Sequence, residues 1–214
     1  MSKEETLARL VSDGYLKTDR IIEAMRTVPR EDFVPLQMRP YAWEDHPLPI
    51  GHCQTISAPH MYAIMLENAE IRPGDRVLEI GTGSGYGSAL LSFLAGKKGK
   101  VFSLEVVHAL ADSARKNLAR AGLDATIIEA DGRQGYPQGA PYDRILVTAS
   151  SENVPSALLE QLKIGGRMLI PVGSHFQELL LLEKSKTGVE TKSILPVVFV
   201  PLVGDRPAGQ HRGA

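Results

Sequence analysis

From Arg72 onward, short apolar runs of strand length alternate with longer segments whose apolar residues recur at helical spacing. The predicted strands cover residues 76–80, 100–104, 125–129, 142–147, 167–172, 178–183 and 193–200, and the predicted helices cover residues 86–95, 107–121 and 155–162. Successive strands joined through helices pair in parallel, and the helices cover both faces of the sheet. The alternation therefore predicts an α/β fold with a doubly wound, mostly parallel sheet.

The segment before this alternation has a different character. Its apolar residues first follow helical spacing, and Thr18 is expected to be the N-cap of a second helix that ends before Pro29. A stretch rich in proline and aromatic residues follows, and Phe33, Tyr41 and Trp43 indicate an ordered loop packed on the rest of the chain. We expect one domain, in which N-terminal helices and a substrate loop (1–70) pack on a main α/β part (71–204), followed by a flexible tail (205–214).

Charge and cysteine content narrow the possible functions. The 24 Lys and Arg residues nearly balance the 25 Asp and Glu residues, whereas proteins that bind nucleic-acid phosphates usually carry a basic excess. The single cysteine, Cys53, excludes an intramolecular disulfide and a cysteine-based metal cluster. The N-terminus does not resemble a signal peptide, and the longest apolar runs are too short to cross a bilayer. We expect a cytoplasmic monomer that binds neither nucleic acid, membrane nor metal.

A glycine-rich run follows the first predicted strand and reads Glu79-x-Gly81-x-Gly83-x-Gly85. In open α/β sheets, ligands bind at the carboxyl ends of the strands, and glycines let a ligand approach the backbone closely. The dinucleotide fingerprint G-x-G-x-x-G does not fit either register of this run. A carboxylate at Glu79 would repel a pyrophosphate but suits a cofactor with an amino group and a sulfonium. The run resembles the first motif of the Rossmann-like methyltransferases, which implies S-adenosyl-L-methionine as cofactor.

Two further strand ends carry acidic residues in the expected order. Glu105 ends the second predicted strand, where a carboxylate can accept hydrogen bonds from both ribose hydroxyls. Asp131-Gly132 follows the third strand, where methyltransferases of this type contact adenine. Taken singly, the glycines could be structural, Glu105 a solvated strand end and Asp131 a turn former. Together they predict a cofactor site made of Glu79, Gly81, Thr82, Gly83, Ser84, Gly85, Glu105, Asp131 and Gly132.

The methyl acceptor is indicated by other residues. After the fourth predicted strand the chain reads Thr148-Ala149-Ser150-Ser151, which lacks the Asn/Asp-Pro-Pro-Tyr run of enzymes that methylate exocyclic or amide nitrogens. The segment 49–61, with Thr-Ile-Ser-Ala-Pro-His at 55–60, strongly resembles the signature of the protein-L-isoaspartate O-methyltransferase family. The resemblance covers nearly the whole chain and includes the matching runs 77–85, 130–133, 140–143, 159–173 and 199–202.

This resemblance implies a Rossmann-like class I methyltransferase fold and a specific reaction. Family members transfer a methyl group from S-adenosyl-L-methionine to the free α-carboxylate of L-isoaspartyl residues in aged proteins and peptides, and S-adenosyl-L-homocysteine leaves. The ester then collapses to a succinimide, which begins repair of the damaged protein. An α-carboxyl group has a pKa of roughly 3.5, so it is anionic at neutral pH and needs no general base. Aligning it with the methyl donor can contribute about 7–11 kcal/mol in ideal cases.

By resemblance, Ser57 is the active-site serine and would donate a hydrogen bond to that carboxylate. Substrate contacts are expected at Gln54, Thr55, Ile56, His60 and Val200. From the residues alone, Ser57 could instead cap a helix that starts near Ala58, and His60 could be a packed loop histidine. Methylation of another carboxylate or of a small molecule, and cofactor binding without transfer, are the alternative functions.

Overall fold

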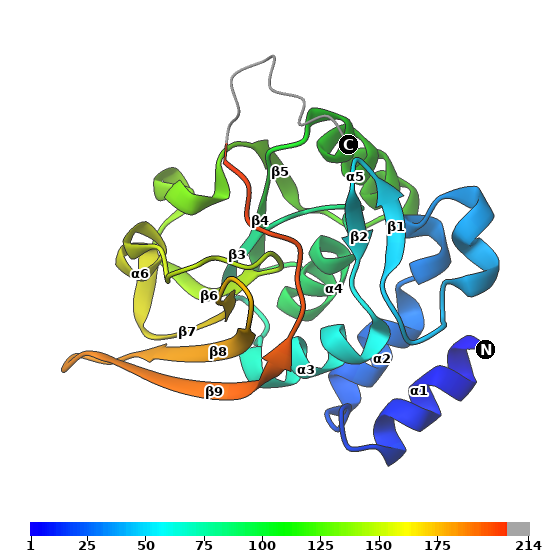
Figure 1. The fold of residues 1–214 in the computed structure, drawn as a ribbon, viewed down its shortest axis with the longest axis horizontal. Coiled ribbons are helices and arrows are strands. Elements are labelled where there is room, and N and C mark those ends of the chain that lie inside the picture. The colour runs from blue at the N-terminus through cyan, green and yellow to red at the C-terminus, as the bar shows by residue number, and fades with distance from the viewer. Residues whose placement is uncertain (205–214) are drawn as a thin grey trace.

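The computed structural model describes residues 1–204 and is built around a seven-stranded sheet of strand order β5-β4-β3-β6-β7-β8-β9 (Figure 1). Its strands are β3 (Arg76–Ile80), β4 (Lys100–Glu105), β5 (Thr126–Glu129), β6 (Tyr142–Val147), β7 (Leu162–Val172), β8 (Gln177–Lys184) and β9 (Val189–Val197). The strands from β5 to β7 are parallel, whereas β8 and β9 are antiparallel to their neighbours. The predicted mostly parallel sheet is confirmed. The predicted tail, 205–214, lies outside the described residues.

Side chains alternate along the strands and build a hydrophobic cluster on each face of the sheet. Val77 belongs to the cluster under most of the helices, and its neighbour Leu78 belongs to the cluster on the opposite face. The helices are α1 (Lys3–Ser12), α2 (Asp19–Thr27), α3 (Pro59–Ala69), α4 (Tyr86–Ala95), α5 (His108–Ala121) and α6 (Ser156–Gln161). Short 3-10 helices are η1 (Arg30–Phe33), η2 (Leu36–Tyr41), η3 (Gly132–Gln134) and η4 (Pro137–Gly139). None of the helices in residues 1–204 is long and apolar enough to span a membrane.

The strand order reverses between β3 and β6, because the chain first adds β4 and β5 on one side of β3 and then continues with β6 on the other. In a sheet of this kind, the helices that follow neighbouring strands leave on opposite faces at such a point and open a crevice at the carboxyl ends of the strands. The glycine-rich run at the end of β3 lies at this point. The fold therefore places the predicted cofactor residues at the position where open α/β sheets bind their ligands.

The N-terminal residues share the main hydrophobic cluster with the sheet. Leu7, Met25, Phe33 and Trp43 are all buried in it, as expected for an ordered loop, whereas Tyr41 is exposed. Thr18 does occupy the N-cap position of α2, which ends before Pro29 as predicted. Its hydroxyl donates to Glu67 Oε2 at 2.7 Å and makes no capping bond, so here the residue ties α2 to α3.

Three local features differ from the sequence-based expectation. A hairpin of β1 (Leu48–Gly51) and β2 (Gln54–Ile56) was not predicted, because its turn residues are not turn formers yet have positive φ angles of 52° at His52 and 57° at Cys53. The last strand runs from Val189 to Val197 and leaves Val200 beyond its end. Helix α6 stops at Gln161, where β7 begins.

Candidate active site

Two cavities meet at the carboxyl edge of the sheet. The first, called here the strand-end cavity, is lined by residues that follow β3, β4, β5 and β6, by the hairpin strand β2 and by the segment 200–203. The second, called here the wide cavity, encloses about 830 Å³ between the start of α3, the end of β9 and the loop before β8. Both cavities are lined by Thr55, Thr148 and Val200. In Figure 1 the segment after β9, drawn in red, passes between the β1–β2 hairpin and the central strands.

The glycines of the run after β3 form part of the wall of the strand-end cavity. Gly81 has a φ angle of +94°, and a Cβ built on it would lie 2.5 Å from Thr148 Oγ1. Gly81 and Gly83 line the cavity, whereas Gly85 is the N-cap of α4 and packs against Ala114 of α5. The backbone at Gly81 therefore occupies a position that an ordinary residue could not take without displacing Thr148.

Glu105 lies in the same wall and is almost completely buried. Its Oε2 accepts the Gly83 amide at 2.8 Å, and its Oε1 accepts the amides of Val106 and Val107 at 3.0 and 2.9 Å. A carboxylate has roughly four acceptor positions. One position on Oε2 therefore remains for a ligand hydroxyl, so the predicted contact with two hydroxyls would require the Gly83 amide to move.

Glu79 was predicted to bind the cofactor, and the structure places it behind the cavity wall. Its side chain does not line the strand-end cavity; it lies fully buried beneath α4, where Oε2 accepts hydrogen bonds from Ser88 and Ser103. Residues alternate between the faces of a strand, so Glu79 shares the helix-covered face with Val77. The carboxyl group lies behind the glycine-rich run and lines neither the strand-end cavity nor the wide cavity.

Burial also gives Glu79 a measurable pH dependence. Desolvation raises its pKa from 4.5 to about 7, against the opposing hydrogen bonds from Ser103 and Ser88. At pH values below the pKa of Glu79 in the unfolded chain, the carboxyl group is protonated in both the folded and the unfolded protein. No charge is then buried, so folding carries no penalty from this group. As the pH rises toward the folded pKa, only the unfolded chain ionises freely, so the wild-type protein loses stability. When the pH is raised from about 5 to about 8, we expect the free energy of unfolding of wild type to fall by about 2 kcal/mol relative to that of Glu79→Gln. Urea unfolding at both pH values measures this, and a difference independent of pH would refute it.

The remaining predicted cofactor residues divide between the cavity wall and its support. Gly132 lines the strand-end cavity, and a Cβ there would lie 2.3 Å from Ile80 Cγ2. Asp131 does not line it; its carboxylate accepts the Arg133 backbone amide at 2.9 Å and binds the Arg133 side chain. Thr82 and Ser84 are buried behind the wall. The predicted cofactor residues thus lie around one cavity, and only some of their side chains line it.

Ser57 is half-buried and lines the wide cavity. The interpretation of Ser57 as a helix cap is wrong, because Ala58 is the N-cap of α3 and makes no side-chain capping bond. Asp45 supplies the missing acceptor: its Oδ1 accepts the His60 amide at 2.9 Å in the first turn of α3. The serine side chain is therefore not used to start the helix.

His60 also lines the wide cavity, with a defined orientation. Its Nδ1 lies 2.9 Å from Asp45 Oδ1, and Arg9 of α1 binds the other oxygen of Asp45 at 3.1 Å. These contacts leave Nε2 as the ring nitrogen without an assigned partner among residues 1–204. Asp45 thus holds both the backbone amide and the ring of His60.

The other predicted substrate residues are placed differently. Thr55 and Val200 line both cavities, Gln54 lines only the strand-end cavity, and Ile56 is buried in the core and lines neither. Sequence analysis missed Thr148, although it directly follows β6 at the point where the strand order reverses, which is a usable signal. It also missed Phe176 of the wide cavity, for which no pattern in the sequence gives a signal.

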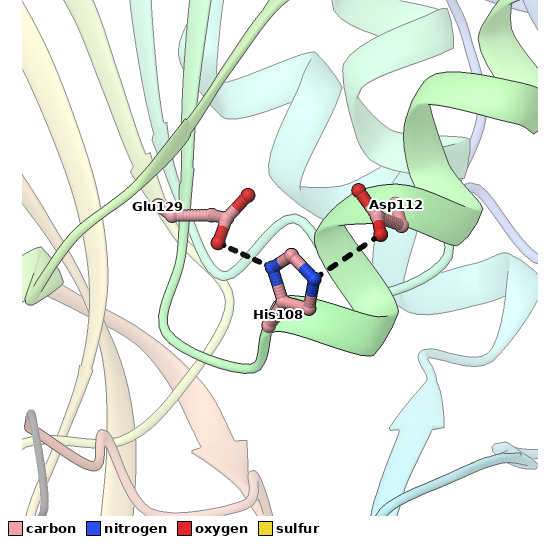
Figure 2. Close-up of side chains that lie close together, drawn as sticks. All are labelled: His108, Asp112 and Glu129. Atoms are coloured by element: carbon pink, nitrogen blue, oxygen red, sulfur yellow. Dashed lines mark hydrogen bonds and ion pairs between the residues drawn. The ribbon is translucent and has the colours of Figure 1, made fainter.

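Away from both cavities, His108, Asp112 and Glu129 have the composition of a metal site and offer ligand atoms within 4.8 Å of one another. Figure 2 shows the imidazole between the two carboxylates, with Nδ1 2.6 Å from Glu129 and Nε2 3.3 Å from Asp112. Arg115 binds both carboxylates as well, at 2.8 and 2.9 Å. Since each carboxylate is already bound by a ring nitrogen of His108 and by Arg115, the arrangement is an exposed network of hydrogen bonds and ion pairs.

Comparison with known proteins gives matches along the whole chain. The family described as Protein-L-isoaspartate(D-aspartate) O-methyltransferase matches residues 1–207. A protein-L-isoaspartate O-methyltransferase of Ignicoccus hospitalis is 50% identical over 204 residues, which cover 94% of this chain and 97% of that protein. A solved structure of the same name superposes with a TM-score of 0.86 at 32% identity, covering 95% of this chain and 67% of the other.

A second solved structure adds information about a ligand. It is a Plasmodium falciparum chain described as a protein-L-isoaspartate O-methyltransferase in complex with S-adenosyl-L-homocysteine. The superposition has a TM-score of 0.85 at 27% identity and covers 95% of this chain and 99% of the other. The likeness therefore extends over the N-terminal helices as well as the sheet.

Proposed function

Since the chain belongs to the protein-L-isoaspartate(D-aspartate) O-methyltransferase family, we propose that it methylates the free α-carboxylate of L-isoaspartyl residues in aged proteins and peptides. The methyl donor is S-adenosyl-L-methionine and the product is S-adenosyl-L-homocysteine, the ligand of the Plasmodium relative. The ester collapses to a succinimide, and hydrolysis of the succinimide returns part of the material to normal aspartate. The enzyme thereby begins repair of the damaged chain.

The observation that carries this proposal is the junction of the two cavities. The strand-end cavity has a backbone cradle at Gly81 and Gly83 and a buried acceptor at Glu105, which suits a nucleoside with a hydroxylated ribose. The wide cavity is large enough for a peptide segment and contains Ser57. Because both share Thr55, Thr148 and Val200, ligands in the two cavities would lie next to each other, as methyl transfer requires.

The cradle residues fit the cofactor, and each has a definable task. Gly81 and Gly83 leave room beside the backbone, Glu105 accepts a ribose hydroxyl, and Gly132 bounds the far end of the cavity. When bound, S-adenosyl-L-methionine supplies an electrophilic methyl group on a sulfonium. Ser57 would donate a hydrogen bond to one oxygen of the substrate carboxylate. The other oxygen would form the bond to the methyl carbon as the bond between that carbon and sulfur breaks. No proton is released, so the site needs no general base.

We further propose that the protein acts as a cytoplasmic monomer on peptides and proteins, and not on nucleic acid or at membranes. The nearly balanced charge and the single unpaired cysteine, Cys53, support this. We also propose that residues 1–70 and 71–204 form one domain, since their side chains share a hydrophobic cluster.

Repair of an aged peptide tests the function together with the role of Ser57. Incubation of an L-isoaspartyl peptide with wild-type protein and S-adenosyl-L-methionine should convert it progressively to the aspartyl form, measured by chromatography. Ser57→Ala should lower turnover about tenfold, because it removes a hydrogen bond to a charged group, and should leave S-adenosyl-L-homocysteine affinity unchanged. Ser113→Ala, an exposed serine on α5, is the matched control. Persistence of the isoaspartyl peptide with wild-type protein would refute the function, and full turnover by Ser57→Ala would refute the role of the serine.

A further inference from the structure

Arg30 is a completely buried cation directly behind the active-site serine. Its Nη2 donates to the backbone carbonyl of Ser57 at 2.7 Å, and its Nε donates to the carbonyl of Ala42 at 2.6 Å. Its Nη1 has no hydrogen-bond partner among residues 1–204. Within the same residues no carboxylate forms an ion pair with it. The rings of Tyr86 and Tyr62 face it, with centroids 5.1 and 5.8 Å away, and the Asp45 carboxylate acts on it from beyond ion-pair distance. The positive charge is therefore enclosed and has no carboxylate in direct contact among residues 1–204.

Such a placement is costly for the folded protein. A charge taken out of water without an opposite partner destabilises the structure by several kcal/mol. Helix α3 begins just after Ser57, and the N-terminus of a helix is itself electropositive, so a cation there is doubly unfavourable. Burial lowers the pKa of Arg30, but a guanidinium with an ordinary pKa above 12 remains protonated. Stability alone does not explain why an arginine occupies this position.

Arg144 at the other end of α3 shows what a structural arginine looks like in this protein. Its Nε and Nη2 donate to the carbonyls of Ala69 and Glu70, at 2.5 and 2.9 Å. These are the last residues of the helix, where the dipole favours a cation, and Asp75 lies 3.7 Å away. Arg144 thus has a nearby carboxylate and lines neither of the two cavities.

The arrangement around Arg30 instead suits an anion in the wide cavity. Arg30 holds the carbonyl of Ser57, and in a trans peptide the following N–H points the opposite way. That N–H belongs to Ala58, which lines the wide cavity. The dipole of this peptide group is therefore aligned with the buried charge. Both present a positive potential where Ser57 meets the cavity.

We propose that Arg30 is a positioning residue that makes the Ser57 region selective for a carboxylate, by fixing the Ser57–Ala58 peptide group and supplying positive charge through it. This inference rests on the proposed function. A cation in direct contact would hold the attacking oxygen, whereas a cation one peptide group away attracts the anion and leaves that oxygen free to react. After transfer the ester is neutral, so the same potential no longer holds it and the product can leave.

A thermodynamic cycle that changes the charge of residue 30 and the charge of the peptide, and measures peptide affinity in each case, tests this proposal. The ligands are an L-isoaspartyl peptide with a free α-carboxylate and the same peptide with an α-carboxamide, each titrated into protein saturated with S-adenosyl-L-homocysteine. Wild type should prefer the carboxylate at least about tenfold, a difference of about 1.4 kcal/mol. Arg30→Gln should lose most of this preference, and Arg30→Lys, which keeps the charge, should retain most of it. Arg144→Gln is the matched control and should keep the preference even if its melting temperature falls.

Several results would overturn the inference. Arg30 is only structural if Arg30→Gln weakens both peptides by the same factor, and its charge is irrelevant if Arg30→Lys loses the preference completely. Binding of S-adenosyl-L-homocysteine identifies variants that have folded. If Arg30→Gln does not fold, the carboxylate preference of Arg30→Lys decides whether the proposal holds. The two proposals fail separately: wild-type protein that neither methylates nor binds the isoaspartyl peptide refutes the function, whereas active wild type with an unchanged preference in Arg30→Gln refutes only the role of Arg30.

Discussion

Glu105→Ala is expected to weaken the binding of S-adenosyl-L-homocysteine about 100-fold. In the proposed complex, Glu105 accepts a hydrogen bond from a ribose hydroxyl, and loss of such a bond to a charged acceptor costs about 1.5–3 kcal/mol. The substitution also removes the acceptor that holds the amides of Gly83, Val106 and Val107, so part of the cavity wall loses its fixed position. Isothermal titration calorimetry with the purified variant measures the change directly.

Glu129→Ala is the matched control for this prediction. Glu129 is the residue paired with Glu105 in the parallel register of β4 and β5, at the same edge of the sheet. Its carboxylate is exposed and bound to His108 and Arg115, and it does not line the strand-end cavity. We expect its affinity to stay within about twofold of wild type, as for a typical surface change. If Glu105→Ala binds as tightly as Glu129→Ala, Glu105 does not hold the ribose.

Gly81→Ala should reduce S-adenosyl-L-homocysteine affinity roughly 10- to 100-fold, because overpacking a close contact costs about 1–3 kcal/mol. The new Cβ would lie 2.5 Å from Thr148 Oγ1, so either the cradle or the threonine must move. The φ angle of +94° adds a strain of about 1–3 kcal/mol, which lowers the free energy of unfolding. Calorimetry and urea unfolding separate the two effects.

Two companion variants identify the cause of the loss. Gly74→Ala has nearly the same φ angle, +93°, with nothing within 4 Å of its new Cβ, so it should lose stability but no affinity. Adding Thr148→Ala to Gly81→Ala removes the clashing hydroxyl and should restore part of the affinity. Wild-type affinity in Gly81→Ala would contradict the assignment of this backbone to the cofactor cradle.

Much of the site follows from the strand pattern alone. Once residues 76–80 and 100–104 are recognised as parallel strands, their carboxyl ends must meet at one edge, which brings the glycine-rich run and Glu105 together. The loops of the cofactor site are therefore predictable without a structure. The fold class follows from the same alternation.

The direction of individual side chains does not follow from that pattern. Strands covered on both faces are apolar throughout, so the sequence does not indicate to which face of the sheet the Glu79 side chain points. In the structure its carboxyl group lies behind the glycine-rich run. Arg30 is in a polar stretch that reads as surface, and its burial arises from Tyr62 and Tyr86, which the fold brings from distant segments. The β1–β2 hairpin depends on positive φ angles at His52 and Cys53 that these residue types do not signal.

In the proposed reaction, the methyl group is directed to an isoaspartyl carboxylate. The most direct measurement uses two peptides that differ only in L-isoaspartyl or L-aspartyl linkage, incubated with the protein and methyl-labelled S-adenosyl-L-methionine. We expect base-labile label in the isoaspartyl peptide alone, since only its α-carboxylate is free to reach Ser57 across the shared residues Thr55, Thr148 and Val200. Equal label in both peptides, or label in neither, would contradict the isoaspartyl carboxylate as the methyl acceptor.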